Sequence, residues 1–304
     1  MSSLTQADDY LHRPSDHPDW RESYYFNWVD LKAGICGFST VALLPNIPKR
    51  ELVLAVFVNG NPELYLTEPH APIPQNFAEA FSDGHLAYAM DEPFGSWSIS
   101  FAGPRFSLEA NWQPRFKPYD FGRGSGVTWG RHLEQSGRMT GVFQFTDGRK
   151  HHFTGMGQRD KSWGVRDWHI DGWFHIMAQF DDFMIGFRRD VVAGKAYVSG
   201  CVSSAKTNTP VTEVAVDTKF VEEGIRKPVE AKIRMRDAKG RSYALRSHLI
   251  APLTFARYAR QFPGGETELF EELVIFELDA PRQQGVGLAE WVITHRTSTE
   301  TPKH

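Results

Sequence analysis

Residues 96–112 read SWSISFAGPRFSLEANW, and apolar and polar side chains alternate on both sides of a short turn. Apolar residues occupy every second position of 97–101 and again of 106–112, with Gly103-Pro104 between the two runs. A period of two places one face of a strand against a core and leaves the other face polar. This stretch therefore predicts an antiparallel hairpin with one buried face.

The same pattern recurs along the chain. Three more hairpins are predicted where alternating runs flank turn residues: 139–145 with 150–156, 173–180 with 183–189, and 231–236 with 242–247. An apolar strand is expected over 52–58, and short helices over 75–81 and 253–261. Many short strands separated by turns are typical of sandwiches and barrels and not of βαβ units. We therefore predict an all-β fold.

Length and composition set the domain organisation. The chain has 304 residues, of which 41% are apolar and 13% aromatic, enough for a large core or for two domains of about 150 residues. We expect a loosely held N-terminal tail over 1–20, one β-barrel or half-barrel domain over 21–150 and a second over 151–304. The polar C-terminal end, 297–304, is expected to be loosely held as well.

Charge and cysteine content exclude several classes of partner. The formal net charge is −3, so no basic surface is available for nucleic acid or an anionic membrane. Two cysteines, Cys36 and Cys201, exclude a disulfide framework.

The N-terminus has no apolar signal segment and no apolar run reaches about 18 residues. We expect a soluble, cytoplasmic protein without stable membrane insertion; a homodimer is left open.

Residues 155–175, GMGQRDKSWGVRDWHIDGWFH, break the alternation. Ionisable groups and tryptophans are mixed here, and burial beside aromatic rings perturbs pKa values and suits general acids and bases. The candidate catalytic residues are Arg159, Asp160, Arg166, Asp167 and His169. The same arginines and aspartates could instead form a salt-bridge network in an irregular loop that joins the two halves.

Candidate substrate-binding residues surround this segment in the sequence or lie near the chain ends: Trp163, Trp168, Trp173, His175, Tyr25 and Glu290. Glu290 belongs to an apolar final strand, and a buried carboxylate must be paired or protonated. If the final strand closes the second barrel with Glu290 inside, Arg159 or Arg166 is the expected partner.

Metal and nucleotide sites are not indicated. No His, Cys or carboxylate spacing matches a metal site, although His169 and His175 flank Asp171. The glycine-rich runs at 122–126 and 155–157 do not open a helix after a strand. We therefore expect neither a metal nor a cofactor.

Several segments resemble one known group of proteins. The pattern G-x-G-x-R-D-x-S-W-G-x-R-D-W over 155–168 resembles the signature of the paired lipocalin-like domains grouped with carotenoid 1,2-hydratase (hydroxyneurosporene synthase). The segments at 22–26, 134–137 and 285–291, together with Asp30, are similar to that group as well. The resemblance implies two lipocalin-like barrels or half-barrels. It also implies hydratase, cyclase or isomerase chemistry on hydrophobic molecules without a redox cofactor. It assigns no catalytic residue.

Residues and resemblance together favour a cofactor-independent lyase or isomerase that acts on a terpenoid, steroid or lignin-like aromatic molecule in an apolar cavity between the halves. Asp167 or His169 would transfer the proton, Arg159 or Arg166 would tune it, and the tryptophans would stabilise positive charge. The alternative is a non-catalytic carrier of a hydrophobic ligand.

Overall fold

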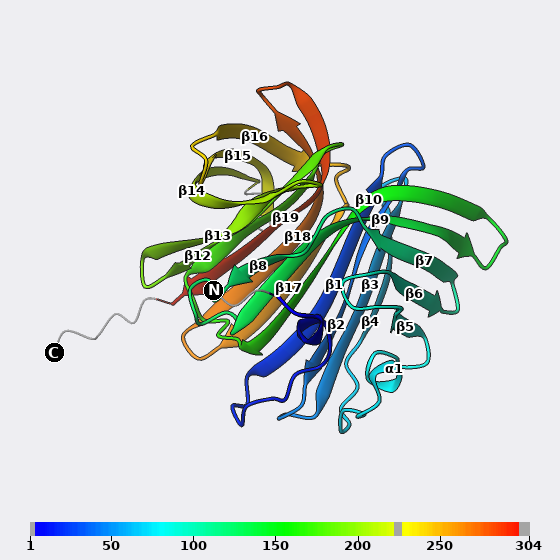
Figure 1. Cartoon of the computed structure of the whole chain (residues 1–304). Coiled ribbons are helices and arrows are strands. Elements are labelled where there is room, and N and C mark those ends of the chain that lie inside the picture. The colour runs from blue at the N-terminus through cyan, green and yellow to red at the C-terminus, as the bar shows by residue number, and fades with distance from the viewer. Residues whose placement is uncertain (1–3, 222–226, 298–304) are drawn as a thin grey trace.

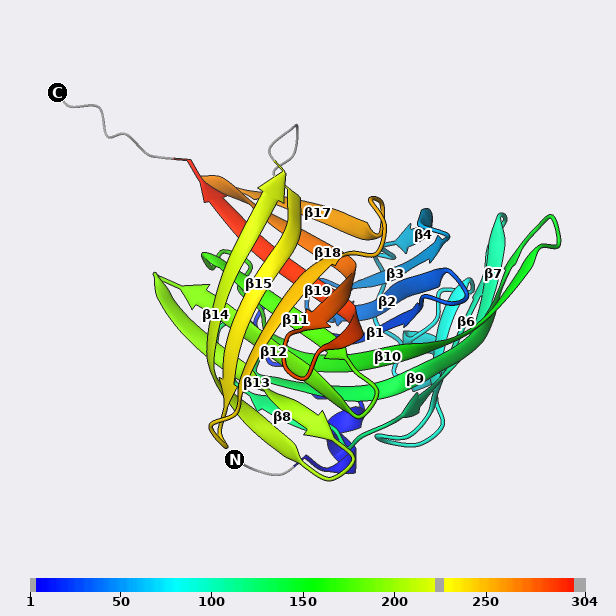
Figure 2. The same ribbon diagram turned by 90° about the horizontal axis from the view of Figure 1, so that it is seen from above.

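The computed structural model describes residues 4–221 and 227–297, and most of them lie in antiparallel strands of two sheets. Figures 1 and 2 show the two sheets side by side, with β1 and β10 of the first sheet next to β11, β18 and β19 of the second. The described residues include two short helical segments, a 3-10 turn at Gln6–Asp9 and α1 at Phe77–Ala80. None of the described helices is long and apolar enough to cross a membrane.

The first sheet forms a half-barrel in the order β4-β3-β2-β1-β10-β9-β7-β6-β5, with β8 paired to β9. Its strands are β1 (Trp20–Asp30), β2 (Ile35–Leu44), β3 (Lys49–Val58), β4 (Asn61–Thr67), β5 (Leu86–Met90), β6 (Trp97–Ala102), β7 (Phe106–Pro114), β8 (Tyr119–Gly122), β9 (Arg131–Phe145) and β10 (Lys150–Val165).

The second sheet runs in the order β16-β15-β14-β13-β12-β11-β19-β18-β17, and pairing of β16 with β18 closes an eight-stranded barrel. Its strands are β11 (Gly172–Gln179), β12 (Phe183–Val192), β13 (Lys195–Ser204), β14 (Asn208–Val221), β15 (Lys227–Asp237), β16 (Ser242–Leu249), β17 (Phe255–Phe262), β18 (Gly265–Leu278) and β19 (Gln283–Arg296). The predicted all-β fold of a barrel packed against a half-barrel is confirmed. The expected boundary at residue 150 lies in the β9–β10 hairpin.

The local predictions are confirmed at the hairpins. Pairing joins β6 to β7, β9 to β10, β11 to β12 and β15 to β16, as their alternation predicts. The helix predicted over 253–261 is wrong, because this segment is strand β17 and pairs along β18 from Phe255 to Phe262. The helix predicted over 75–81 is one turn long, at α1.

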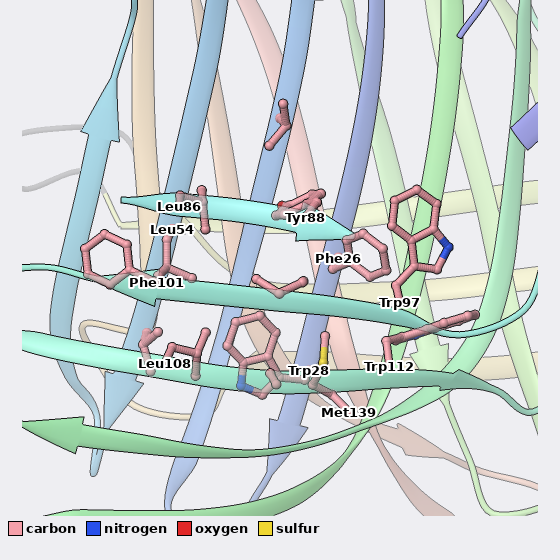
Figure 3. Close-up of a cluster of buried hydrophobic side chains, with 14 of the residues drawn as sticks. Phe26, Trp28, Leu54, Leu86, Tyr88, Trp97, Phe101, Leu108, Trp112 and Met139 are labelled. Atoms are coloured by element: carbon pink, nitrogen blue, oxygen red, sulfur yellow. The ribbon is translucent and has the colours of Figure 1, made fainter. Parts of the chain in front are cut away.

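Each sheet fills its own inner face with side chains. In the half-barrel, alternate residues of β1 (Tyr24, Phe26 and Trp28) pack against aromatic residues of β5 to β7, and Figure 3 shows this cluster around Trp97 and Trp112. In the barrel, a second cluster contains Phe174, Phe187 and Trp291. The interiors of both sheets are therefore packed cores.

A third cluster joins the two sheets at their outer faces. Tyr25, Phe38 and Phe57 of the half-barrel pack with Leu273 and Leu288 of the barrel. Strand β1 is consequently buried on both faces, which explains why alternation disappears from its sequence. The same reason applies to β10, which continues to Val165 where an irregular loop was expected.

The N-terminal segment is not a loose tail over its described part. Asp9 is fully buried and forms an ion pair with Arg159, while Asp8 pairs with Arg131. His12 stacks on Trp163 with 4.0 Å between ring centroids. The part of this segment around Asp8 and Asp9 is therefore packed against β9 and β10, where it supplies acidic partners for their cations.

Candidate active site

A cavity of about 400 Å³ lies between the outer faces of the two sheets. Residues of β1 and β10 line one side and residues of β11, β18 and β19 line the other. The predicted position at the junction of the two halves is consistent with this placement. The lining is not apolar, however, since it includes Arg21, Asp160, Arg166, Glu271 and Glu290.

In each sheet, the strand register places several ionisable residues next to one another in a row that crosses the strands. In the half-barrel, Tyr25 of β1 lies opposite Asp160 of β10, which lies opposite Glu134 of β9. Residues directly opposite each other in antiparallel strands project from the same face. This row, the half-barrel row, therefore points as a unit toward the barrel.

The barrel presents a matching row. Arg188 of β12 lies opposite His175 of β11, His175 lies opposite Glu290 of β19, and Glu290 lies opposite Glu271 of β18. These four residues form the barrel row, which projects away from the barrel interior. Glu290 therefore faces the cavity and not the inside of the second barrel, correcting the expectation from sequence.

One contact joins the two rows. His175 Nε2 lies 2.6 Å from Glu134 Oε1, and His132 Nε2 lies 3.3 Å from the same oxygen. Gly186 of β12 leaves the room for this carboxylate, since a Cβ there would lie 2.4 Å from Glu134 Oε2. Gln158 donates a hydrogen bond to that second oxygen. Both Glu134 oxygens are thus satisfied inside the interface.

The contact is a charged pair. Burial alone would lower the pKa of His175, but Glu134 and Glu290 outweigh it and raise the pKa to about 10. Burial would raise the pKa of Glu134, but His175 and His132 lower it below its ordinary value. At neutral pH His175 is an imidazolium and Glu134 a carboxylate, so His175 is a poor proton acceptor.

Glu290 is an ionised carboxyl group of the cavity. The Trp173 indole N–H donates to Glu290 Oε1, and His175 Nδ1 lies 3.7 Å from the same oxygen. Burial would raise the pKa of Glu290, but His175, Arg188 and the indole hydrogen bond lower it. The partner expected from the sequence, Arg159 or Arg166, makes no ion pair with it within the described residues.

Two further carboxyl groups have raised pKa values. Burial, with Glu290 and Asp160 nearby, raises the pKa of Glu271 well above its ordinary value. Burial, with Glu134 and Glu290 nearby, also raises the pKa of Asp160. Within the described residues, neither carboxyl makes a hydrogen bond or ion pair, and the buried Tyr25 hydroxyl has no partner either. Two carboxyl groups with raised pKa values and one hydroxyl, all without a protein partner among the described residues, therefore border the cavity.

The structure separates the residues predicted from sequence into two sets. Seven line the cavity: Tyr25, Asp160, Arg166, Trp168, Trp173, His175 and Glu290. Asp167 and His169 pair with each other outside it, with side chains 49% and 53% exposed. Their predicted catalytic role stays a prediction.

Arg159 and Trp163 lie on the opposite face of β10 from Asp160. Arg159 donates to both Asp9 oxygens and to Gln135, and its guanidinium lies 5.5 Å from the ring centroid of Trp97. Arg159 thus forms a salt bridge, as the alternative proposed, but its partner is Asp9 and the segment up to Val165 is a strand and not an irregular loop. Adjacent residues of a strand point to opposite faces, so Arg159 and Asp160 do not share a site.

Glu134, His132, Glu271 and Arg188 were not among the site residues predicted from sequence. Glu134 belongs to the segment that carries the family resemblance, and polar residues on both faces of β9 were an available signal. Glu271 and Arg188 lie in strands whose alternation gives no indication of a second sheet over their outer face. Among the described residues, no group of three or more His, Cys, Asp or Glu side chains has an arrangement suited to a metal ion.

A closed barrel beside a half-barrel, with an ionisable cavity between them, defines the class of paired lipocalin-type β proteins. The chain belongs to the family described as "Domain of unknown function (DUF7064)", whose model matches residues 5–294. A comparison with curated protein sequences finds no match.

Solved structures share this fold at low sequence identity. A protein of Nitrosomonas europaea assigned provisionally as AttH has a TM-score of 0.66 and 15% identity, over 92% of this chain and 96% of its own. Kievitone hydratase from Nectria haematococca has a TM-score of 0.64 and 11% identity, over 95% and 93%. CghA with Sch210972 has a TM-score of 0.62 and 11% identity, over 92% and 89%. These likenesses confirm the fold that the resemblance to the carotenoid hydratase group implies.

Proposed function

We propose that the chain is a lyase or isomerase of hydratase type that uses its own side chains as general acid and base. The observation that carries this proposal is a set of carboxyl groups around one cavity whose pKa values shift in opposite directions: that of Glu290 is lowered, whereas those of Asp160 and Glu271 are raised. Environments that push the pKa values of neighbouring groups apart identify an acid and a base.

Asp160 is the proposed acid and Glu290 the proposed base. In hydration, Asp160 gives its proton to one carbon of a C=C bond, whose electrons form the new C–H bond. The neighbouring carbon becomes electron-deficient and bonds to a water oxygen while Glu290 takes a proton from that water. In isomerisation, Glu290 instead removes a proton from an adjacent carbon and the double bond moves.

The aromatic walls suit such a step. Trp168 and Trp173 lie 5.5 Å apart between ring centroids and both line the cavity. Ring faces stabilise a developing cation, and the rings bind the apolar part of a terpenoid, steroid or aromatic substrate. The hydratase activity in the name of kievitone hydratase, which shares the fold, supports the same class of reaction.

The test follows the isotopes of water. Purified protein is incubated with a panel of unsaturated aromatic and terpenoid compounds in water labelled with heavy oxygen, and in parallel in heavy water. We expect the wild type to place solvent oxygen, or solvent hydrogen at carbon, in one product class. Glu290→Gln should slow this by about 10²–10⁴-fold, as expected for loss of a general base. Glu277→Gln, an exposed change on neighbouring β18, is the control.

Binding without any isotope incorporation would contradict the enzyme proposal and favour the carrier. Equal incorporation by the wild type and Glu290→Gln would instead show that Glu290 is not the base.

A further inference from the structure

We infer that the substrate carries a carboxylate, which Arg166 binds at the end of the cavity next to Trp168. This inference rests on the proposed function in that the bound molecule is a substrate. The anion site itself follows from the arginine side chains and their contacts.

The guanidinium of Arg166 is held in place but is not neutralised. Its Nη2 donates to Ser162 Oγ at 2.8 Å, and it lies 5.2 Å from the Trp168 ring centroid. Within the described residues it forms no ion pair, whereas its two arginine neighbours do: Arg188 pairs with Asp190 and Arg21 with Glu51. A guanidinium has five N–H donors, so most of those on Arg166 remain available to a ligand.

The neighbouring arginines have unused donors as well. Arg21 Nε and Arg188 Nη2 are buried and have no hydrogen-bond partner. Burial, with Arg21 and Arg188 nearby, lowers the pKa of Arg166. Three guanidiniums with free N–H groups around one cavity form a positive site that an anion would stabilise.

A carboxylate fits this site best. Two parallel N–H···O bonds match the planar fork of arginine to a carboxylate. Asp160 and Glu290 are close enough to affect the pKa of Arg166, so the bound anion would lie near the proposed acid and base. Its negative charge would also help to keep Asp160 protonated.

The experiment uses a matched pair of probes, 2-naphthoate and its neutral isostere 2-naphthamide, with calorimetric titration of the full chain near pH 7.5. We expect wild type to bind the acid at least about tenfold more tightly than the amide, the value of a hydrogen bond to a charged group. Arg166→Gln should remove this preference while the affinity for the amide stays within about threefold. Arg166→Lys, which keeps the charge but loses the fork, should recover part of it.

Arg246→Gln is the matched control. Arg246 lies on β16, does not line the cavity, and its side chain is 54% exposed. We expect this variant to keep the preference for the acid, and circular dichroism of all variants should match the wild type.

Equal affinity for acid and amide in the wild type would overturn the inference, as would a preference that survives in Arg166→Gln. Failure of both probes to bind at millimolar concentration would also contradict it. Preference for the acid in a protein that shows no isotope incorporation would keep the anion site and overturn only the enzyme proposal.

Discussion

At the scale of single residues, the contact between Glu134 and His175 holds the two sheets in register. Both groups are buried, and each supplements a weaker contact within the partner's own sheet, His132 for Glu134 and Glu290 for His175. Replacing one member of a buried pair typically costs about 3–5 kcal/mol. The pair therefore links folding of the barrel to that of the half-barrel.

This pair makes stability depend on pH in a defined direction. The pKa of His175 rises from 6.5 to about 10 in the folded protein, so the folded state retains the proton over that interval. The stability it contributes is complete below pH 6.5 and is lost as the pH rises through about 10. Urea denaturation at several pH values should show this loss in the wild type.

His175→Gln should be less stable by about 3–5 kcal/mol at pH 7. The difference between variant and wild type should shrink at alkaline pH. A difference that stays constant from pH 6 to pH 10 would contradict a charged His175.

At the residue scale, the sequence indicated a segment that borders the cavity but not which of its faces does so. Arg159, Asp160 and Arg166 were all identified as candidates, yet only Asp160 and Arg166 line the cavity. Alternation assigns faces only where one face is polar, and β10 has polar residues on both. The sequence does not show which polar group of β10 has a partner inside the half-barrel. That group is Arg159, and its partner, Asp9, lies 150 residues away in sequence.

At the scale of elements, the N-terminal segment and β10 depend on each other. Asp9 satisfies Arg159, and backbone carbonyls of Asp8 and Tyr10 accept hydrogen bonds from Lys161. Without this segment, β10 would bury two cations against the aromatic core with Glu22 and Gln135 as their remaining polar contacts.

Asp9→Asn should therefore lower the free energy of unfolding by about 3–5 kcal/mol, measured by urea denaturation, because the guanidinium of Arg159 stays buried without its counter-ion. Asp16→Asn, an exposed change in the same segment, should stay within about 0.5 kcal/mol of the wild type. Naphthoate affinity should be unchanged in Asp9→Asn, because Arg159 faces away from the cavity. A stable Asp9→Asn protein with reduced affinity would instead place Arg159 in the site.

Element prediction succeeded at the hairpins, including the mostly buried β11–β12 pair, and failed where neither a turn nor alternation marks a strand. The hairpin of β6 and β7 follows directly from its alternation. Segment 253–261 does not alternate clearly, and its strand conformation comes from pairing of β17 with β18, a contact that a local pattern does not encode. The sequence also did not predict that β10 continues to Val165. Both faces of β10 are covered, so polar and apolar residues do not alternate along it.

At the scale of the whole molecule, the site exists only because two sheets pack by their outer faces. The interiors are filled by their own cores, so the ionisable rows meet between the sheets, beside the cluster of Tyr25, Phe38 and Leu288. The sequence predicted two β units and a cavity at their junction. It named Asp160, His175 and Glu290 of the ionisable lining but not Glu271 or Arg188, because no local pattern shows which strands of the two units face one space.

The most direct test of the proposed site compares two conservative variants, Asp160→Asn in the cavity and Asp167→Asn outside it, by turnover of a compound that the wild type converts. Both side chains keep their size, and melting temperatures establish that both proteins fold. We expect Asp160→Asn to lower kcat by about 10²–10⁴-fold, as for loss of a general acid, and Asp167→Asn to stay within about threefold of the wild type. A large loss in Asp167→Asn with normal turnover by Asp160→Asn would contradict a catalytic site between the two sheets.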